Sequence, residues 1–260
     1  MKQVSFCDNW TCNGSAVVVP HDAMLHGKRS ADAPSGSAGA YFPGGSYRYE
    51  KHFARPQAEH VLLQFEGVYK NAKVFLNGHP AGGTAYGYLP FFIEADPFLV
   101  DGDNVIVIEC ENLDQPDSRW YSGAGIYRPV WLWTGPKQSI APESVRVSTV
   151  SLDPAAIRVE SEEDIRFTVA GISGCGTDFT LTIPDAKLWS EDSPSLYTAE
   201  VTNGFDEIKI TFGIRQIRWS TKGLFVNGRE TLLRGGCLHH DHGILGAATF
   251  DESELRRVKS

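Results

Sequence analysis

Three imidazoles and one carboxylate stand in four consecutive positions, His239-His240-Asp241-His242. Imidazole nitrogens and carboxylate oxygens are metal ligands. In an extended segment, however, neighbouring side chains point to opposite sides, so four consecutive ligands do not readily converge on one ion. The same groups can instead cap a loop or hydrogen-bond to the hydroxyl groups of a ligand. We therefore predict no metal and no cofactor, and take His239 and His240 as candidate ligand-contacting residues.

Asp117, Arg119 and Trp120 form a second candidate group. A carboxylate accepts hydrogen bonds from hydroxyl groups, and the face of an indole packs against C–H surface, so the combination suits a sugar. The alternative is structural: Asp117 pairs with Arg119, and Trp120 fills a core. Other aromatic residues leave a similar choice between a carbohydrate platform and a sandwich core or interdomain seam; they are Tyr86, Tyr88, Phe91, Phe92, Trp131 and Trp133.

The composition limits the class of protein. The chain has 260 residues, of which 42% are hydrophobic and 22% charged, which is typical of a globular protein. One hydrophobic core stops growing near this length, so two domains are expected. The formal net charge of -8, without any basic run, argues against a nucleic-acid partner and an anionic membrane surface.

The cysteines and the first residues predict a cytoplasmic protein. The five cysteines are odd in number, and no C-x-x-C pair offers a metal site or a redox motif, which favours free thiols in a reducing compartment. The first residues run into Phe6 and Trp10 with no apolar stretch of signal-peptide length. No apolar run is long enough to cross a bilayer.

Alternation of apolar and polar residues predicts β-strands along most of the chain. It is clear at 61–65, 165–169, 179–183 and 208–212. Asn77-Gly78 and Asn227-Gly228 follow strand-like runs and suit the positive φ angles of a tight hairpin. No convincing amphipathic helix occurs before about residue 218. These patterns predict an all-β fold of two sandwiches.

The last segment has a different pattern. Thr231-Leu232-Leu233-Arg234 is predicted to be a buried strand, followed by a loop rich in glycine and histidine. Thr249 and Glu252 fit a capping box at the start of a helix, with Leu255 and Val258 on one face. One strand and one helix cannot enclose a core, so this segment alone is not expected to form a complete domain.

A series of motifs occurs in a recognisable order. In the first half they are the stretches 46–53, 65–68, 74–78, 87–91 and 119–128. In the second half they are 188–190, 194–197, 212–215, 225–229 and 232–236. Together they resemble the amino-terminal part of glycoside hydrolase family 2, the family of β-galactosidases, β-glucuronidases and β-mannosidases.

This resemblance implies three parts. Residues 1–136 would form a jelly-roll sugar-binding domain, and residues 137–216 an immunoglobulin-like β-sandwich. Residues 217–260 would be the first strand and helix of a truncated (β/α)8 barrel, a fold that typically needs about 250 residues. The boundary after the first domain is expected near Gly135-Pro136.

The resemblance also implies a function. Retaining glycoside hydrolysis uses two carboxyl groups about 5 Å apart, one as acid and base and the other as nucleophile. In the family the acid/base follows an asparagine, and no Asn-Glu pair occurs in this sequence. We therefore predict no catalytic residue here, and expect the non-catalytic portion of a β-galactosidase-like enzyme that acts on a carbohydrate and is a homo-oligomer when intact. A free-standing carbohydrate-binding module and a structural interaction domain remain the alternatives.

The resemblance gives His239 a role as well. It matches the family histidine that reaches sugar hydroxyls from the loop after the first barrel strand, at the carboxyl end where barrel active sites form. The family has Val-Asn-Arg between the preceding glycine and that histidine. Here Gly236-Cys237-Leu238 stands before it, so the flanking polar contacts differ.

Overall fold

The structure is a computed structural model that describes residues 1–141, 143–239 and 241–260. Contacts divide the chain into two compact units. The large unit comprises Lys2–Thr134 and Cys237–Ser260, and the small unit comprises Met1 and Gly135–Gly236. The carboxyl-terminal segment thus belongs to the large unit, although more than a hundred residues separate it from the rest of that unit. The predicted division into three domains stays a prediction.

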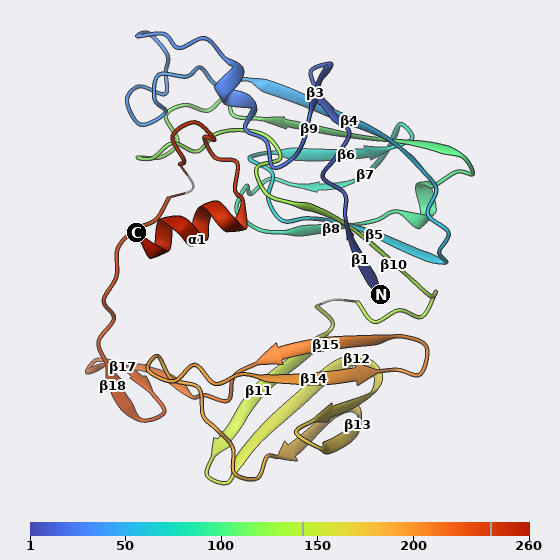
Figure 1. Ribbon diagram of the computed structural model, residues 1–260, viewed down its shortest axis with the longest axis vertical. Helices are drawn as coiled ribbons and strands as arrows, with labels where there is room; N and C mark the ends of the chain where they lie inside the picture. The colour runs from blue at the N-terminus through green and yellow to red at the C-terminus, as the bar shows by residue number, and fades with distance from the viewer. Residues whose placement is uncertain (142, 240) are drawn as a thin grey trace. The chain divides into compact units, whose positions relative to one another are not determined.

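The large unit is a sandwich of two antiparallel sheets (Figure 1). The six-stranded sheet has the order β3-β2-β4-β9-β6-β7, and its strands are Ser15–Val17, Trp10–Cys12, Ser46–Ala54, Asp103–Glu111, Ala72–Leu76 and His79–Thr84. The four-stranded sheet has the order β1-β10-β5-β8, and its strands are Lys2–Ser5, Val130–Gly135, His60–Phe65 and Phe91–Glu94. Two short 3-10 helices, η1 (Ala23–His26) and η2 (Asp96–Phe98), lie in the connections.

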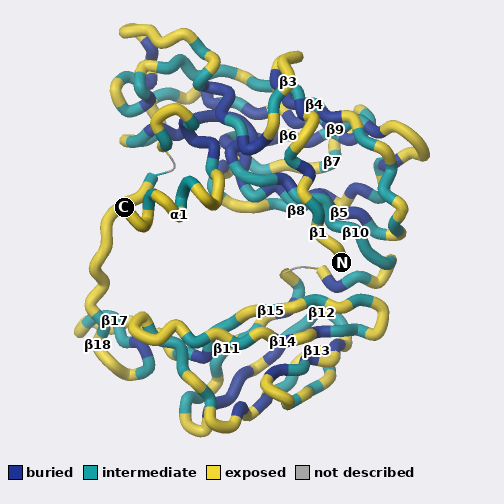
Figure 2. The backbone as a smooth tube through the Cα atoms, in the orientation of Figure 1, coloured by how far each residue is buried: buried dark blue, intermediate teal, exposed yellow. Residues whose placement is uncertain are grey.

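The core of the large unit follows from the two-residue period of its strands. In β9, Ile106, Ile108 and Cys110 are buried, while the residues between them face outward. Phe65 and Trp10 bring large side chains to the same cluster from other strands. Figure 2 shows this buried backbone running through both sheets. The prediction of an all-β fold is confirmed.

The turn between β6 and β7 is the hairpin that the sequence predicts. Asn77 and Gly78 have φ angles of 48° and 81°, and Leu76 pairs with His79. The Asn77 side chain also accepts a hydrogen bond from the Val105 N–H at 2.8 Å, which ties the turn to β9. Asn227-Gly228 forms the second predicted hairpin, between β17 and β18.

The small unit is built on a five-stranded antiparallel sheet of β11 to β15. These strands are Val145–Leu152, Ala155–Val169, Ile172–Thr182, Tyr197–Thr202 and Glu207–Phe212. Strand β12 is long, and its pairing with β13 shifts register between Glu160 and Ile165. The two halves of β12 therefore pair with different strands, β11 before the shift and β14 after it. Phe167, which is completely buried, lies in the core of this unit.

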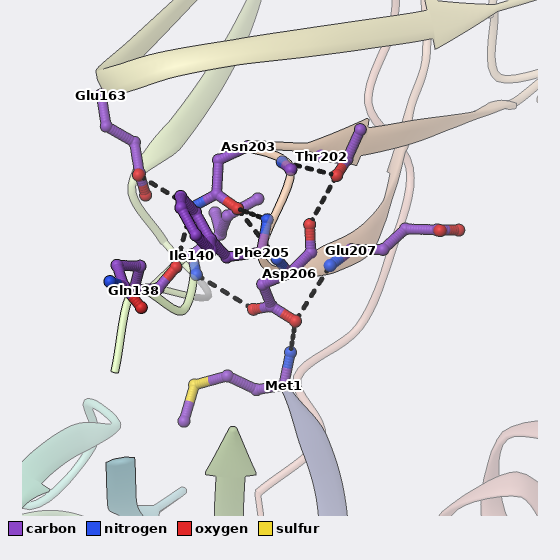
Figure 3. Close-up of polar contacts among 10 residues, drawn as sticks. Met1, Gln138, Ile140, Glu163, Thr202, Asn203, Phe205, Asp206 and Glu207 are labelled. Atoms are coloured by element: carbon purple, nitrogen blue, oxygen red, sulfur yellow. Dashed lines mark hydrogen bonds and ion pairs between the residues drawn. The ribbon is translucent and has the colours of Figure 1, made fainter. Parts of the chain in front are cut away.

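Asp206 organises the turn between β14 and β15 (Figure 3). Its carboxylate accepts hydrogen bonds from the Ile140 N–H at 3.0 Å and the Glu207 N–H at 2.9 Å, and it pairs with the amino group of Met1. Asn203 donates to the Gln138 carbonyl oxygen at 2.8 Å within the same network. Asp206 is therefore a partly buried hydrogen-bonding centre of this turn.

The predicted strand Thr231–Arg234 is wrong. A small sheet of β16 (Ile217–Ser220), β17 (Gly223–Val226) and β18 (Arg229–Thr231) ends at residue 231. Leu232 and Leu233 follow without strand structure, and they are 76% and 70% exposed. A strand forms where a neighbouring strand pairs with its backbone N–H and C=O groups, and no described strand pairs with this segment.

The terminal helix is present, but its predicted cap is wrong. Helix α1 is Asp251–Lys259, and its N-cap residue is Phe250, which makes no side-chain capping bond. The Thr249 hydroxyl donates to the Ala247 carbonyl oxygen instead. Leu255 and Val258 are exposed at 54% and 66%. None of the helices in the described residues has the length and apolar character to span a membrane.

Candidate functional site

The rings of Trp120 and His239 stack on each other. Their centroids are 4.8 Å apart and their planes differ by 15°. Trp120 lies in the loop between β9 and β10, and His239 lies between β18 and α1. The indole N–H of Trp120 donates to the Tyr88 hydroxyl at 3.3 Å. The structure thus brings together one residue from each of the two groups that the sequence singled out.

Asp117 is the acidic residue of the same loop, and it is firmly held. Its Oδ2 accepts a hydrogen bond from the Tyr69 hydroxyl at 2.6 Å and from the Lys70 ammonium at 3.1 Å. Burial, and then the hydrogen bond to Asp117, raises the pKa of Tyr69, so the phenol stays a donor. Asp117 Oδ1 accepts no hydrogen bond from a described residue.

Two tyrosines join Asp117 to the stacked rings. The Tyr69 and Tyr88 rings meet edge to face with centroids 5.2 Å apart. Because Tyr69 bonds to Asp117 and Tyr88 bonds to Trp120, the acid and the stacked pair belong to one cluster. Tyr86 packs on Tyr88 at 5.5 Å and is 57% exposed. The site therefore combines a held carboxylate with aromatic faces.

The structural alternative for this loop is wrong. Arg119 is exposed and makes no salt bridge with any described residue, whereas Lys70 is the ionic partner of Asp117. Trp120 is half-buried and does not belong to a core cluster. Lys70 and Tyr69 could not be predicted as partners of Asp117 from the sequence, because they lie on a different loop, between β5 and β6.

The aromatic residues of the first unit have different roles. Phe91 stacks on Phe65 with centroids 5.0 Å apart, as the core interpretation expects. Trp131 and Trp133 are half-buried on β10, and their indole N–H groups donate to Glu66 at 2.6 Å and to Gln64 at 2.8 Å. The tyrosines of the 86–88 stretch thus differ from these tryptophans, because they line the site.

The histidine-rich stretch sends its side chains to different partners. His239 stacks on Trp120, Asp241 pairs with Arg257 at 2.9 Å, and His242 bonds to Glu254. His240, the other predicted contact residue, lies outside the described residues. The described members are tied to α1 and to the Trp120 loop, so the loop-capping interpretation holds for Asp241 and His242.

Asp22 is a buried acid that sequence reasoning missed. It is 2% exposed, and it accepts hydrogen bonds from the Met24, Ala124 and Ala247 N–H groups and from the Tyr121 hydroxyl. Acidic side chains are almost never fully buried unless paired in this way. The available sequence signal was an aspartate directly before the apolar stretch Ala23–Leu25.

A separate group of potential metal ligands, His60, Glu94 and Asp96, lies at one end of β5 and β8. His60 Nδ1 is 2.7 Å from Asp96 Oδ2, and His60 Nε2 is 3.6 Å from Glu94 Oε2. The two ring nitrogens face different carboxylates, and a single ion cannot bind both nitrogens of one ring. The geometry fits a hydrogen-bonded ion-pair network.

Comparison with known proteins places this architecture in a family. The model of glycosyl hydrolases family 2 matches residues 138–215. A β-galactosidase of Bacteroides ovatus, BoGH2A, is 35% identical over an alignment that covers 99% of this chain and 34% of that protein. A protein of Formosa agariphila described as a putative β-glucuronidase is 29% identical, and the alignment covers 88% of this chain and 25% of that protein.

Solved structures agree. A β-glycosidase from Bacteroides vulgatus superposes on all of this chain with a TM-score of 0.86 and 25% identity, and the chain covers 40% of it. A family 2 glycosyl hydrolase from Bacteroides cellulosilyticus has a TM-score of 0.84 and is covered to 41%. The chain thus spans well under half the length of these relatives. Its sequence and its fold show that it belongs to glycosyl hydrolases family 2.

Proposed function

We propose that this chain is the non-catalytic, amino-terminal portion of a retaining β-glycosidase, most similar to a β-galactosidase, and that its large unit contacts the sugar. The observation that carries the proposal is the cluster of Asp117 with the stacked Trp120 and His239 rings. The names of the relatives, β-galactosidase and β-glucuronidase, support a β-linked sugar as the ligand.

The chemistry of the cluster supports binding more than bond cleavage. Tyr69 and Lys70 both donate to Oδ2 of Asp117, and Oδ1 accepts no hydrogen bond from a described residue, so it can accept one from a sugar hydroxyl. The indole and imidazole faces can pack against the C–H surface of a pyranose ring. Retaining hydrolysis needs two facing carboxyl groups, and we assign that pair to the remainder of the enzyme.

Exposed apolar side chains favour a portion of a larger enzyme over a free-standing binding module. Leu232, Leu233 and Leu238 are 76%, 70% and 58% exposed, and Ile244 is 94% exposed. The first two belong to the small unit and the last two to the large unit, and exposed apolar side chains on each unit are typical of surfaces that pack against other protein. Homo-oligomerisation of the intact enzyme and its cytoplasmic location stay predictions.

The experiment is a titration of the purified chain with nitrophenyl β-galactoside and with nitrophenyl β-glucuronide. Calorimetry measures binding, and the release of nitrophenol measures hydrolysis. We expect weak binding without turnover. Asp117→Asn should lower the affinity, because the amide presents only one acceptor, while Asp101→Asn at a fully exposed position should not. Turnover that is lost when one of the chain's own carboxylates is replaced would refute the non-catalytic role. An affinity that is unchanged in Asp117→Asn would refute the site.

A further inference from the structure

We infer that Asp22 is a positioning residue, whose buried carboxylate holds the segment bearing His239 in register with the loop bearing Trp120. This inference deepens the proposed sugar-binding role and rests on it for its functional consequence. The structural part concerns only side chains and backbone groups of the large unit. It can therefore be tested whether or not a sugar binds.

The two carboxylate oxygens of Asp22 accept hydrogen bonds from different donors. Oδ1 accepts from the Met24 N–H at 3.0 Å and from the Ala124 N–H at 3.1 Å. Oδ2 accepts from the Tyr121 hydroxyl at 2.7 Å and from the Ala247 N–H at 2.8 Å. One carboxylate oxygen thus joins two segments that are far apart in sequence.

Each of those segments also carries one of the stacked rings: Tyr121 is adjacent to Trp120, and Ala247 is eight residues after His239. Tyr121 is the residue after Trp120, and burial together with the neighbouring Asp22 raises its pKa, so its hydroxyl remains a donor. Ala247 follows a tight turn in which the N–H groups of His242 and Gly246 each donate to the other residue's carbonyl oxygen at 2.7 Å. That turn lies between His239 and Ala247 in the sequence.

Close packing around Asp22 leaves little freedom for the two segments. A Cβ atom on Gly246 would lie 2.2 Å from Asp22 Oδ2. A Cβ atom on Gly123 would lie 2.4 Å from the Cβ of Ala247 and 2.8 Å from Asp22 Oδ2. Ala247 itself is completely buried. The backbones meet the carboxylate so closely that only glycine fits at both positions.

A second anchor acts from the other side of the segment. Arg257 of α1 donates to the His239 carbonyl oxygen and to the Asp241 carboxylate. The Thr249 N–H donates to the Tyr127 carbonyl oxygen at 2.9 Å. The contact of Thr249 reaches the loop between β9 and β10 at Tyr127, whereas the contacts of Arg257 stay within the carboxyl-terminal segment. Asp22 joins the same two segments at Tyr121, the residue next to Trp120.

The structural test is the nuclear magnetic resonance spectrum of His239. Its ring protons lie over the Trp120 indole, so they should be shifted upfield, and the shift should vanish in Trp120→Leu. Asp22→Asn keeps the size of the side chain but replaces one acceptor oxygen with a donor, so we expect it to lose most of the upfield shift. Asp101→Asn is the matched control. An unchanged His239 shift in folded Asp22→Asn would overturn the inference.

A second variant decides the question if Asp22→Asn does not fold. Gly246→Ala leaves Asp22 intact and places a methyl group against Oδ2, so it should push the segment away while the sandwich stays folded. We expect the His239 shift to collapse here too. A retained shift in Gly246→Ala would contradict the inference as directly as a retained shift in Asp22→Asn.

A double-mutant cycle gives the functional readout with nitrophenyl β-galactoside. If Asp22 acts through His239, Asp22→Asn and His239→Ala should each weaken binding by about two- to tenfold, and the double variant should be no weaker than His239→Ala alone. Additive losses would overturn the positioning role. If the unmodified chain binds no sugar, the proposed function fails, and the His239 spectrum still tests the placement.

Discussion

The indole of Trp120 and the imidazole of His239 lie face to face with 4.8 Å between their centroids, although they come from the two separate sequence segments of the large unit. Trp120 is also fixed by its hydrogen bond to the Tyr88 hydroxyl. The stacked pair is therefore preorganised, and a ligand that packs on it need not order these side chains first.

Replacement of Trp120 should weaken sugar binding in proportion to the aromatic face that is lost. Aromatic contacts of this kind contribute about 0.5–1.5 kcal/mol, so Trp120→Ala should reduce the affinity by roughly two- to tenfold. Trp120→Phe should retain part of it. The control is Trp219→Ala, because Trp219 is 70% exposed in the small unit. Calorimetry that finds equal affinities for Trp120→Ala and Trp219→Ala would contradict the placement of the site.

Gly125 should tolerate no side chain. Its φ angle is +110°, and an added Cβ would lie 2.0 Å from the Tyr49 hydroxyl oxygen, a buried atom. Backbone strain and overpacking together should lower the free energy of unfolding by about 2–4 kcal/mol in Gly125→Ala. Gly14→Ala is the control, because Gly14 also has a positive φ but open space around it. Urea titration should separate the two variants, and equal midpoints would disprove the steric account.

The parts of the fold that the sequence predicted correctly depend on local patterns. Strands β13 and β15 alternate apolar and polar residues, and Asn77-Gly78 accepts the positive φ angles of its hairpin. Side-chain period and turn chemistry act within a few residues, so they can be inferred without knowledge of the neighbours.

The parts that the sequence did not predict depend on neighbours distant in sequence. Leu232 and Leu233 have the composition of a buried strand, but no described strand covers them. Lys70 replaces Arg119 as the partner of Asp117 because the folding of β5 and β6 brings their connecting loop beside Asp117. Asp22 cannot be distinguished in the sequence from other loop aspartates, because its partner Ala247 lies far away in the chain and reaches it only in the folded structure.

Protonation of His21 should destabilise the fold in acid. Burial, and then the neighbouring His26, lowers the pKa of His21 to about 4, against about 6.5 in the unfolded chain. The unfolded state therefore binds the proton more readily, so this contribution is complete above pH 6.5 and is lost as the pH falls towards 4. His21→Gln should reduce the fall in unfolding free energy across that window, measured by urea titration at several pH values. His79→Gln on β7 is the control. If the unfolding free energy falls equally with pH in the unmodified chain, His21→Gln and His79→Gln, His21 is not the cause.

Each unit has its own hydrophobic core, so a cavity in one core should leave the site in the other intact. Phe167 is completely buried in the small unit, and its ring centroid is 6.1 Å from that of Phe212. Phe167→Ala should lower the free energy of unfolding of the small unit by about 3–5 kcal/mol, whereas Phe205→Ala should change it little, because Phe205 is 66% exposed.

Phe65→Ala makes the equivalent cavity in the large unit, beneath the sheets that carry the site. Under mild denaturant, the His239 ring protons should keep their upfield shift in Phe167→Ala and lose it in Phe65→Ala. Loss of the shift in both variants would mean that the two cores unfold as one cooperative body.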